Sequence, residues 1–263
     1  MSSALEKALG VLEFMVERPM GCPVSEIASS LGMPVSGVHR LLKELESLGY
    51  IRQRRGMGDY CLSIKLASLG LSFLGQTGIS DISQPILDDL AQKSGELVRL
   101  SLIDGDNLIW VGVSQGASSG LRYDPGSDQG KVAHLASSAG GQAWLSTMSD
   151  EQAISLVMKQ GLVKPDMPGD ASPETVASLM SILAKVREQG YSTNANSYLQ
   201  GMAAMAMPIR SPISGEPIGA VSIAGPSVRF GEKEMVALVD DLRLAATELG
   251  EASRASLYFS KRE

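Results

Sequence analysis

The pattern of apolar and polar positions is most regular between residues 24 and 62. It predicts two short helices separated by Gly32-Met33-Pro34, because glycine suits a helix end and proline suits a first turn. The apolar positions of the first helix are Val24, Ile27, Ala28 and Leu31, and those of the second are Val38, Leu41, Leu42, Leu45 and Leu48. Both sets follow the spacing of one helix face, and Gly49 ends the second helix.

Two short strands follow, at residues 50–52 and 60–62. The turn between them is rich in glycine and arginine, and it predicts a hairpin. Two helices joined by a tight turn and followed by a basic hairpin form the layout of a winged helix-turn-helix, which binds nucleic acid. Arg52, Arg54 and Arg55 are the hairpin residues that we expect to contact phosphates.

The outer face of the second helix carries small residues first and then cations: Ser36, Gly37, Arg40 and Lys43. These are candidate DNA contacts. A small helical subdomain with a solvated polar face would have a similar helical pattern, but it would not need an arginine-rich hairpin. The hairpin therefore favours a DNA-binding domain.

The segments on either side of this region indicate where the first domain begins and ends. A helix at residues 3–18 packs under the helix pair, and a helix at 64–74 is apolar nearly all round, which requires more than one packing partner. We interpret the latter as a linker helix that also contacts a second subunit. The predicted division is a DNA-binding domain at 1–63, a linker helix at 64–80 and a further domain at 81–263.

The pattern changes in the further domain, which is predicted to be α+β with a mainly antiparallel sheet and helices packed against it. A helix at about 81–94 has Pro85 in its first turn or at its start, and a strand at 98–102 places Arg99 and Ser101 on a wet face. Further strands are expected at 108–113, 191–194, 202–209 and 218–224. Residues 116–130 are expected to be rich in loops, with a short strand at 121–123 as one option. Further helices are expected to open at Ser137, at Asp150, at Pro173 with Ser172 as its cap, and at Glu232, the last running to Ser256.

Charge and composition agree with a soluble regulator. Residues 1–80 hold eight Lys and Arg against seven Asp and Glu, whereas the remainder holds 15 against 22. A cationic hairpin beside an acidic domain suits a local DNA contact. Cys22 and Cys61 are predicted to be buried thiols rather than a disulfide or a metal site. The chain shows no signal peptide and no membrane span, so we expect a cytoplasmic protein.

The chain resembles IclR-type transcriptional regulators along nearly its whole length. The stretches that carry the resemblance are residues 8–12, 24–34, 38–42, 48–51, 137–145, 186–191 and 220–226. The resemblance implies a winged helix-turn-helix, a linker helix and an effector-binding domain of GAF-like fold. It also implies a homodimer or homotetramer on double-stranded operator DNA, usually as a repressor. Pro34 and His39 join the candidate DNA contacts by their place in the family motif.

The resemblance also implies an effector site, whose candidate residues are Ser138, Ala139, Gly140, Asn194, Ala204, Ser222 and Ala224. The turn at residues 138–141 matches the family's anion-binding corner, in which backbone N–H groups face a ligand. Asn194 stands where family members often have an acid, and Ala204 and Ala224 replace a common Cys and Ser. We therefore expect a roomier, less polar pocket for a small organic effector with an apolar or aromatic body. The matched positions include no Arg or Lys.

The sequence offers little for catalysis. Its only histidines are His39 and His134, no Cys/His spacing suits zinc, and no base is placed beside a nucleophile. Residues 126–131 resemble a phosphate loop, but they are one residue short of the usual spacing and Val132 stands where Ser or Thr is needed. We expect a regulator with no metal and no cofactor. A hydrolase, a transferase or a ligand-binding module without DNA function are the alternatives. Trp110, Trp144, Met202, Met205 and Met207 are apolar residues of the core or of the pocket.

Overall fold

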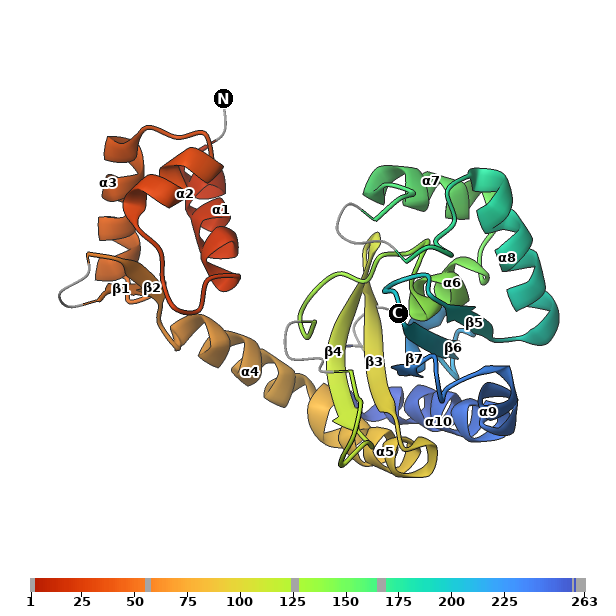
Figure 1. The fold of residues 1–263 in the computed structure, drawn as a ribbon. Coiled ribbons are helices and arrows are strands. Elements are labelled where there is room, and N and C mark those ends of the chain that lie inside the picture. Colours follow the sequence, from red (N-terminus) through yellow and green to blue (C-terminus); the bar gives the residue numbers. More distant parts are fainter. Residues whose placement is uncertain (1–2, 55–57, 124–127, 165–168, 257, 259–263) are drawn as a thin grey trace. The chain divides into compact units, whose positions relative to one another are not determined.

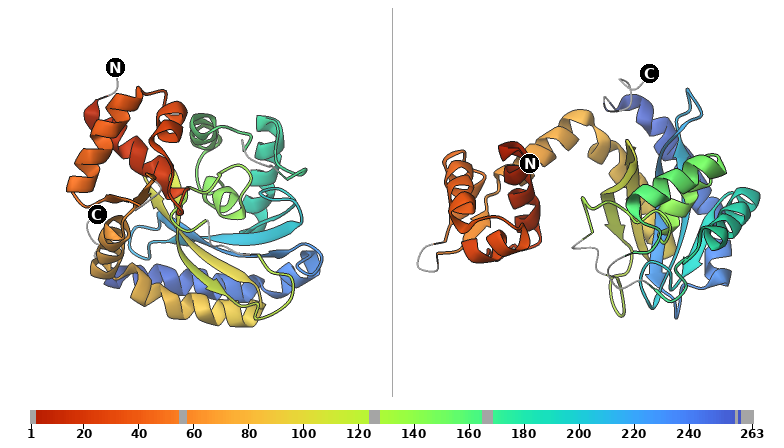
Figure 2. Two further views of the ribbon diagram at one scale, coloured as in Figure 1. Left: turned by 60° about the vertical axis from the view of Figure 1, so that its left-hand side comes forward. Right: turned by 90° about the horizontal axis from the view of Figure 1, so that it is seen from above.

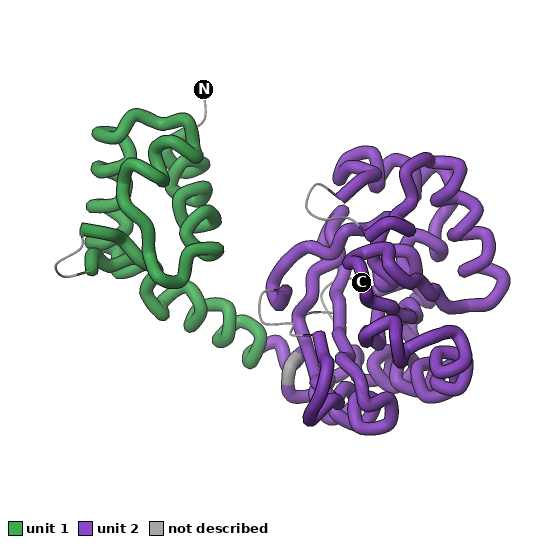
Figure 3. The backbone as a smooth tube through the Cα atoms, in the orientation of Figure 1, with its two compact units in different colours: residues 1–76 green, residues 77–263 purple. Residues whose placement is uncertain are grey.

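The computed structural model describes residues 3–54, 58–123, 128–164, 169–256 and 258. The chain divides into two compact units, residues 1–76 and 77–263, which Figure 3 shows in two colours. The first unit holds helices α1 (Ala4–Val16), α2 (Val24–Ser30) and α3 (Val35–Ser47), the strands β1 (Ile51–Gln53) and β2 (Tyr60–Leu62), and nearly all of α4 (Lys65–Thr77) (Figure 1).

The first unit is a winged helix-turn-helix, as its apolar spacing predicts. Its core consists of the buried faces of α1, α2 and α3 with Ile51 and Tyr60 of the hairpin. β1 and β2 pair antiparallel, and Cys22 joins them by a pair of backbone hydrogen bonds to Tyr60. Cys22 and Cys61 are both buried and free, which confirms the expectation of buried thiols.

The second unit is built on a five-stranded antiparallel sheet of order β4-β3-β7-β6-β5. The strands are β3 (Leu97–Asp104), β4 (Asn107–Gln115), β5 (Ser192–Ala195), β6 (Met202–Arg210) and β7 (Pro217–Pro226). This arrangement confirms the predicted α+β class and the antiparallel pairing.

Helices cover both faces of this sheet, as the two views of Figure 2 show. α5 (Ile79–Ser94) and α10 (Val239–Ala252) lie on one face, whereas α6 (Ala139–Leu145) packs on the other and is backed by α8 (Val176–Gln189). The unit also holds α7 (Asp150–Gln160), α9 (Glu232–Ala237) and the short 3-10 helix η1 (Ser253–Ala255). Among the described residues, no helix is long and apolar enough to cross a membrane.

The double cover corrects the expectation that one face of β3 is wet. Arg99 is only 7% exposed and Ser101 is fully buried. The side chain of Arg99 is enclosed by Trp110, Tyr123 and Asp128, and the hydroxyl of Ser101 lies against Gly140 of α6. Alternation in the sequence shows that two faces differ in polarity. It does not show that the polar face meets water.

Four further expectations about single elements are wrong. Pro85 is the seventh residue of α5 rather than part of its first turn. Residues 121–123 form no strand, because their contacts are to side chains rather than to a neighbouring strand. α8 begins after Thr175, not at Ser172-Pro173. The final helix breaks at Leu238 into α9 and α10 and ends at Ala252.

Candidate functional site

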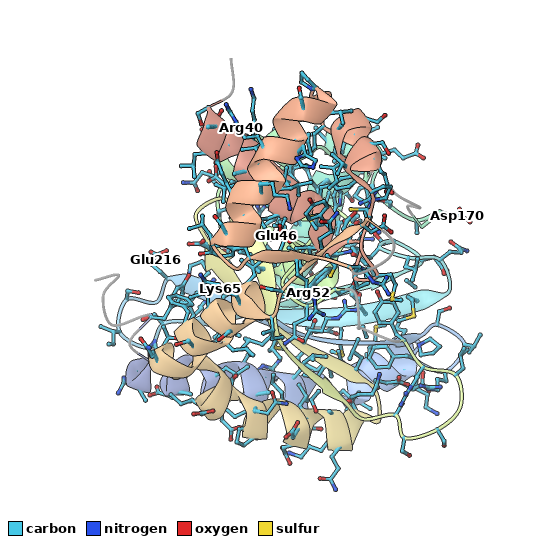
Figure 4. All side chains as sticks on the ribbon, turned by 90° about the vertical axis from the view of Figure 1, so that its left-hand side faces the viewer. Arg40, Glu46, Arg52, Lys65, Asp170 and Glu216 are labelled. Carbon is cyan, nitrogen blue, oxygen red and sulfur yellow. The ribbon has the colours of Figure 1, made fainter. Side chains whose placement is uncertain are left out.

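The first site is the exposed face of α3 together with the hairpin. Among the predicted contacts that the structure describes, Gly37 is half-buried. The others are exposed: Pro34, Ser36, His39, Arg40, Lys43, Arg52 and Arg54. Figure 4, which faces α3, shows Arg40 projecting from the helix and Arg52 on the neighbouring hairpin. Arg55 lies outside the described residues.

The cationic side chains of this face differ in the ion pairs and hydrogen bonds that they make within the protein. Arg40 and Arg52 make no ion pair with the described residues. Lys43 donates to Glu46 at 2.9 Å, and the same carboxylate accepts from the backbone N–H of Gln53 at 3.1 Å, so Glu46 ties α3 to the hairpin. The Nη1 of Arg54 donates to the carbonyl of Met20 at 2.5 Å. Among the described residues of this face, Arg40 and Arg52 are therefore the arginines that are not already held by a strong partner within the protein.

The second site is a cavity in the second unit, between the sheet and the start of α6. It holds about 490 Å³ of atom-free space, its mouth included. All seven residues that the sequence predicts for an effector site line it: Ser138, Ala139, Gly140, Asn194, Ala204, Ser222 and Ala224. The other lining residues are Arg99, Trp110, Tyr123, Tyr198, Leu199, Met202 and Ala203.

Strand register brings the floor of this cavity together. Arg99 on β3 lies directly opposite Ser222 on β7. Ala224 of β7 lies opposite Ala204 of β6, which in turn lies opposite Asn194 of β5. Residues more than 100 positions apart in the chain thus form one surface. The small side chains of the two alanines leave space for a ligand above its centre.

The turn that opens α6 closes the cavity from above. Ser138 caps the helix by accepting from the N–H of Gly141 at 3.1 Å, and its own N–H donates to the carbonyl of His134. The backbone N–H groups of Ala139 and Gly140 donate to no acceptor within the described part of the chain. The predicted row of ligand-facing N–H groups is therefore limited to these two residues.

The two glycines of this turn differ in the room around them. A Cβ on Gly141 would lie 2.4 Å from the carbonyl oxygen of Leu135, which no side chain tolerates, so the backbone needs glycine there. A Cβ on Gly140 would meet its nearest neighbour, a methyl carbon of Leu108, at 3.5 Å, an ordinary contact.

Asn194 supports this turn as well as lining the cavity. Its amide nitrogen donates to the carbonyl of Ser137 at 3.1 Å and lies 3.4 Å from the side-chain oxygen of Gln142. The side-chain amide therefore holds the start of α6 against β5.

The walls of the cavity are aromatic and contain a cation. The guanidinium of Arg99 lies 4.8 Å from the ring centres of both Trp110 and Tyr123, and Trp110 meets Tyr198 edge to face. Arg99 pairs with Asp128 at 2.8 Å, and the hydroxyl of Tyr123 donates to the same carboxylate oxygen. Burial and this hydrogen bond raise the pKa of Tyr123, so its hydroxyl stays protonated and donating.

Arg99 corrects the expectation that no cation serves this site. Its sequence position, on an alternating strand, indicated a solvated side chain instead. Trp110 and Met202 are pocket residues, whereas Trp144, Met205 and Met207 are buried residues outside the cavity lining. Tyr123 and Tyr198 lie in irregular segments, where no periodicity signals a site.

One histidine does contact a hydroxyl. His134 Nδ1 lies 2.8 Å from the hydroxyl of Ser137, and its Nε2 lies 3.0 Å from the carbonyl of Gly161. The carbonyl can only accept, so Nε2 carries the proton and Nδ1 accepts from Ser137. Ser137 is fully buried and does not line the cavity, so this pair fixes the turn before α6.

Comparison with known protein families decides the identity of this architecture. The family described as "Bacterial transcriptional regulator IclR C-terminal" matches residues 71–251, and the IclR helix-turn-helix domain matches residues 4–55. The chain belongs to the IclR family. It is a DNA-binding transcriptional regulator, and its second unit is the effector-binding, GAF-like domain of that family.

Relatives match over nearly the full chain. The acetate operon repressor of Salmonella typhimurium is 30% identical over 246 residues, which cover 94% of this chain and 88% of that protein. The crystal structure of Thermotoga maritima IclR has a TM-score of 0.69 at 27% identity and covers 94% of this chain and 97% of that one. An IclR homologue from Microbacterium hydrocarbonoxydans, solved with 4-hydroxybenzoate, has a TM-score of 0.76 at 23% identity and covers 97% and 100%.

Proposed function

We propose that this IclR-family regulator represses transcription from an operator that it binds as a homodimer or a pair of dimers. A small organic effector, bound in the cavity of the second unit, changes its affinity for that operator. The observation that carries this proposal is that one cavity gathers all seven candidate effector residues from α6, β5, β6 and β7. Because the partner is chromosomal DNA, the protein works in the cytoplasm.

The first unit supplies the DNA contacts. Arg40 lies on the exposed face of α3, where a recognition helix reads the major groove, and arginine makes the commonest specific contact to guanine. Arg52 and Arg54 lie on the hairpin, where they reach phosphates. Arg54 first releases the carbonyl of Met20. Pro34, Ser36, Gly37, His39 and Lys43 complete the proposed interface.

The second unit supplies the effector site. Its lining combines aromatic and aliphatic walls with a few polar groups, which is the usual composition of a small-molecule site. We propose an effector with one polar end and an apolar or aromatic body. The structure of the Microbacterium hydrocarbonoxydans homologue with 4-hydroxybenzoate is consistent with a ligand of that kind.

The effector is bound and is not converted. The only histidine near the cavity accepts from a fully buried serine, and water and substrate do not reach that serine from the cavity. We therefore propose that the domain acts as a sensor without enzymatic activity.

An electrophoretic mobility shift with the DNA upstream of this gene tests the DNA-binding roles. Arg40→Ala should cost roughly 1–3 kcal/mol of binding free energy and relax the preference for operator over random DNA. Arg52→Ala should weaken both DNAs alike and flatten the salt dependence, because it removes a phosphate contact. Equal effects of both variants on both DNAs would refute the role assignment. A wild-type protein that binds no DNA at low salt would refute the regulator.

Ala204→Leu tests the effector site. Ala204 lies on the cavity floor, so a leucine there fills the space of a ligand. Once a screen of carboxylic and aromatic acids identifies a compound that shifts operator binding, this variant should lose the response while keeping its operator affinity. Calorimetry that shows unchanged effector affinity in Ala204→Leu would place the effector elsewhere.

A further inference from the structure

Arg99 is an unusual residue for the interior of a sheet. Its side chain is 8% exposed and lies between the faces of Trp110 and Tyr123, on the wall of the cavity. A guanidinium remains charged at any physiological pH, so burial at this depth requires compensating acceptors. The hydrogen-bond acceptors around the guanidinium of Arg99, and the N–H groups that they leave unpaired, therefore indicate what kind of group this side chain binds.

Asp128 provides only part of that compensation. One carboxylate oxygen, Oδ2, accepts from Arg99 Nη2 at 2.8 Å, and the same oxygen accepts from the hydroxyl of Tyr123. The ion pair therefore uses one nitrogen of the guanidinium and one oxygen of the carboxylate. Arg99 Nε is buried and finds no acceptor in the described part of the chain.

A guanidinium is a planar fork that binds a carboxylate best through two parallel N–H···O bonds. Asp128 does not bind in that way, whereas a ligand carboxylate in the adjacent cavity is not constrained by a backbone. The aromatic walls formed by Trp110, Tyr123 and Tyr198 suit a flat body behind such a carboxylate.

We propose that Arg99 is the anchor for the carboxylate of the effector, and that Asp128 is an internal competitor for the same guanidinium. Asp128 neutralises Arg99 until an effector carboxylate replaces it and completes the fork. This inference rests on the proposed effector function of the cavity. It assigns that function an anionic, flat ligand and names the two residues that set its charge preference.

Benzoate and benzamide test the proposal, because they share a ring and differ in charge. Calorimetry should show that the wild-type protein binds benzoate more tightly than benzamide. Asp128→Asn removes the competing charge at constant size, so benzoate affinity should rise roughly tenfold while benzamide affinity changes little. Asp106→Asn is the matched control, because Asp106 pairs with Lys159 on the surface, outside the cavity. It should leave both affinities unchanged.

The double variant Arg99→Met/Asp128→Asn removes both charges, so no lone charge stays buried and the domain keeps its fold, which circular dichroism verifies. It should bind benzamide and lose the preference for benzoate. A preference that survives in the double variant, a benzoate affinity that Asp128→Asn does not raise, or failure of Asp128→Asn to bind benzoate would overturn the proposal. If the wild-type protein prefers benzoate to benzamide but no carboxylic acid alters operator binding, the proposed effector function is wrong, whereas the role of Arg99 as a carboxylate anchor is retained.

Discussion

At the scale of single residues, His134 shows how a buried polar group holds the effector cavity in shape. It joins the turn before α6 to the end of α7 through Ser137 and the carbonyl of Gly161. Burial lowers the pKa of His134 below its ordinary value of 6.5, and the charge of Lys164 acts in the same direction. The folded protein therefore holds a neutral imidazole whose Nδ1 must accept a hydrogen bond.

This shift makes the stability of the domain depend on pH. Because the pKa is lower in the folded state, the unfolded chain takes up the proton first, and the free energy of unfolding falls as the pH drops below about 6.5. His134→Gln should be less stable at neutral pH but should lose this pH-dependent part. His39→Gln, at the exposed second histidine, is the control and should keep it.

Denaturant unfolding followed by tryptophan fluorescence measures this effect in the second unit alone, since Trp110 and Trp144 are the only tryptophans of the chain and both lie there. If the free energy of unfolding of His134→Gln falls with decreasing pH as steeply as that of the wild type, His134 is not the group responsible.

The residues of the cavity divide into those that sequence reasoning finds and those that it does not. Ser138, Asn194 and Ser222 stand at motif positions of the family, so their chemistry is visible in the sequence. Arg99 is not, because its burial depends on Tyr123 and Asp128, which follow it by more than 20 residues and enclose its side chain only in the folded chain. Local pattern cannot report a cover that comes from a distant segment.

At the scale of elements, α8 illustrates how two possible helix starts are resolved. Ser172-Pro173 and Thr175 are both good starting signals. The structure uses Thr175, which exchanges reciprocal hydrogen bonds with Ser178, while the buried hydroxyl of Ser172 has no partner among the described residues. The segment before the helix is held as a turn by backbone bonds of Gly169 and Ala171 to residues 196 and 197. These long-range bonds explain why the earlier signal is not used.

A pair of substitutions tests this helix start. Thr175→Ala removes the cap and should lower the free energy of unfolding by about 1 kcal/mol, because the N–H of Ser178 loses its acceptor. Ser172→Ala should change it by less than about 0.5 kcal/mol, since its hydroxyl makes no hydrogen bond within the part of the chain that the structure describes. Unfolding followed by tryptophan fluorescence reports on α8, because Trp144 belongs to the same buried cluster as Leu179 and Leu183 of α8. The reverse order of the two effects would restore the start at Ser172.

At the scale of the whole molecule, α4 leaves apolar side chains in solvent on a single chain. Leu69 and Leu71 on α4 and Ile64 just before it are 51%, 68% and 81% exposed. Apolar clusters of this kind on a soluble protein generally mark an interface. We propose a second copy of the chain as the occupant, because a dimer presents two recognition helices to a partly palindromic operator.

Leu71→Glu tests this assembly. Burying a carboxylate in the interface should raise the dimer dissociation constant by about tenfold or more. Ser72→Glu adds the same charge on the polar stripe of α4 that Ser72 shares with Gln76, and it should have a small effect. Sedimentation at micromolar concentration distinguishes the two. A wild-type protein that is monomeric under these conditions would rule out this interface.

The unequal glycines at the start of α6 set the limits within which this protein can be converted into a biosensor for another compound. Gly140 has room for a methyl group, but that methyl would face Leu108, Ala220 and Ser101, which do not line the cavity. The volume above the floor is therefore adjustable from the cavity-lining Ala204 and Ala224, which lie on two separate strands. Gly141 has no such freedom, because its backbone passes against Leu135. A library that varies Ala204 and Ala224 and leaves Gly141 untouched changes which molecules the cavity admits while keeping the turn that shapes it.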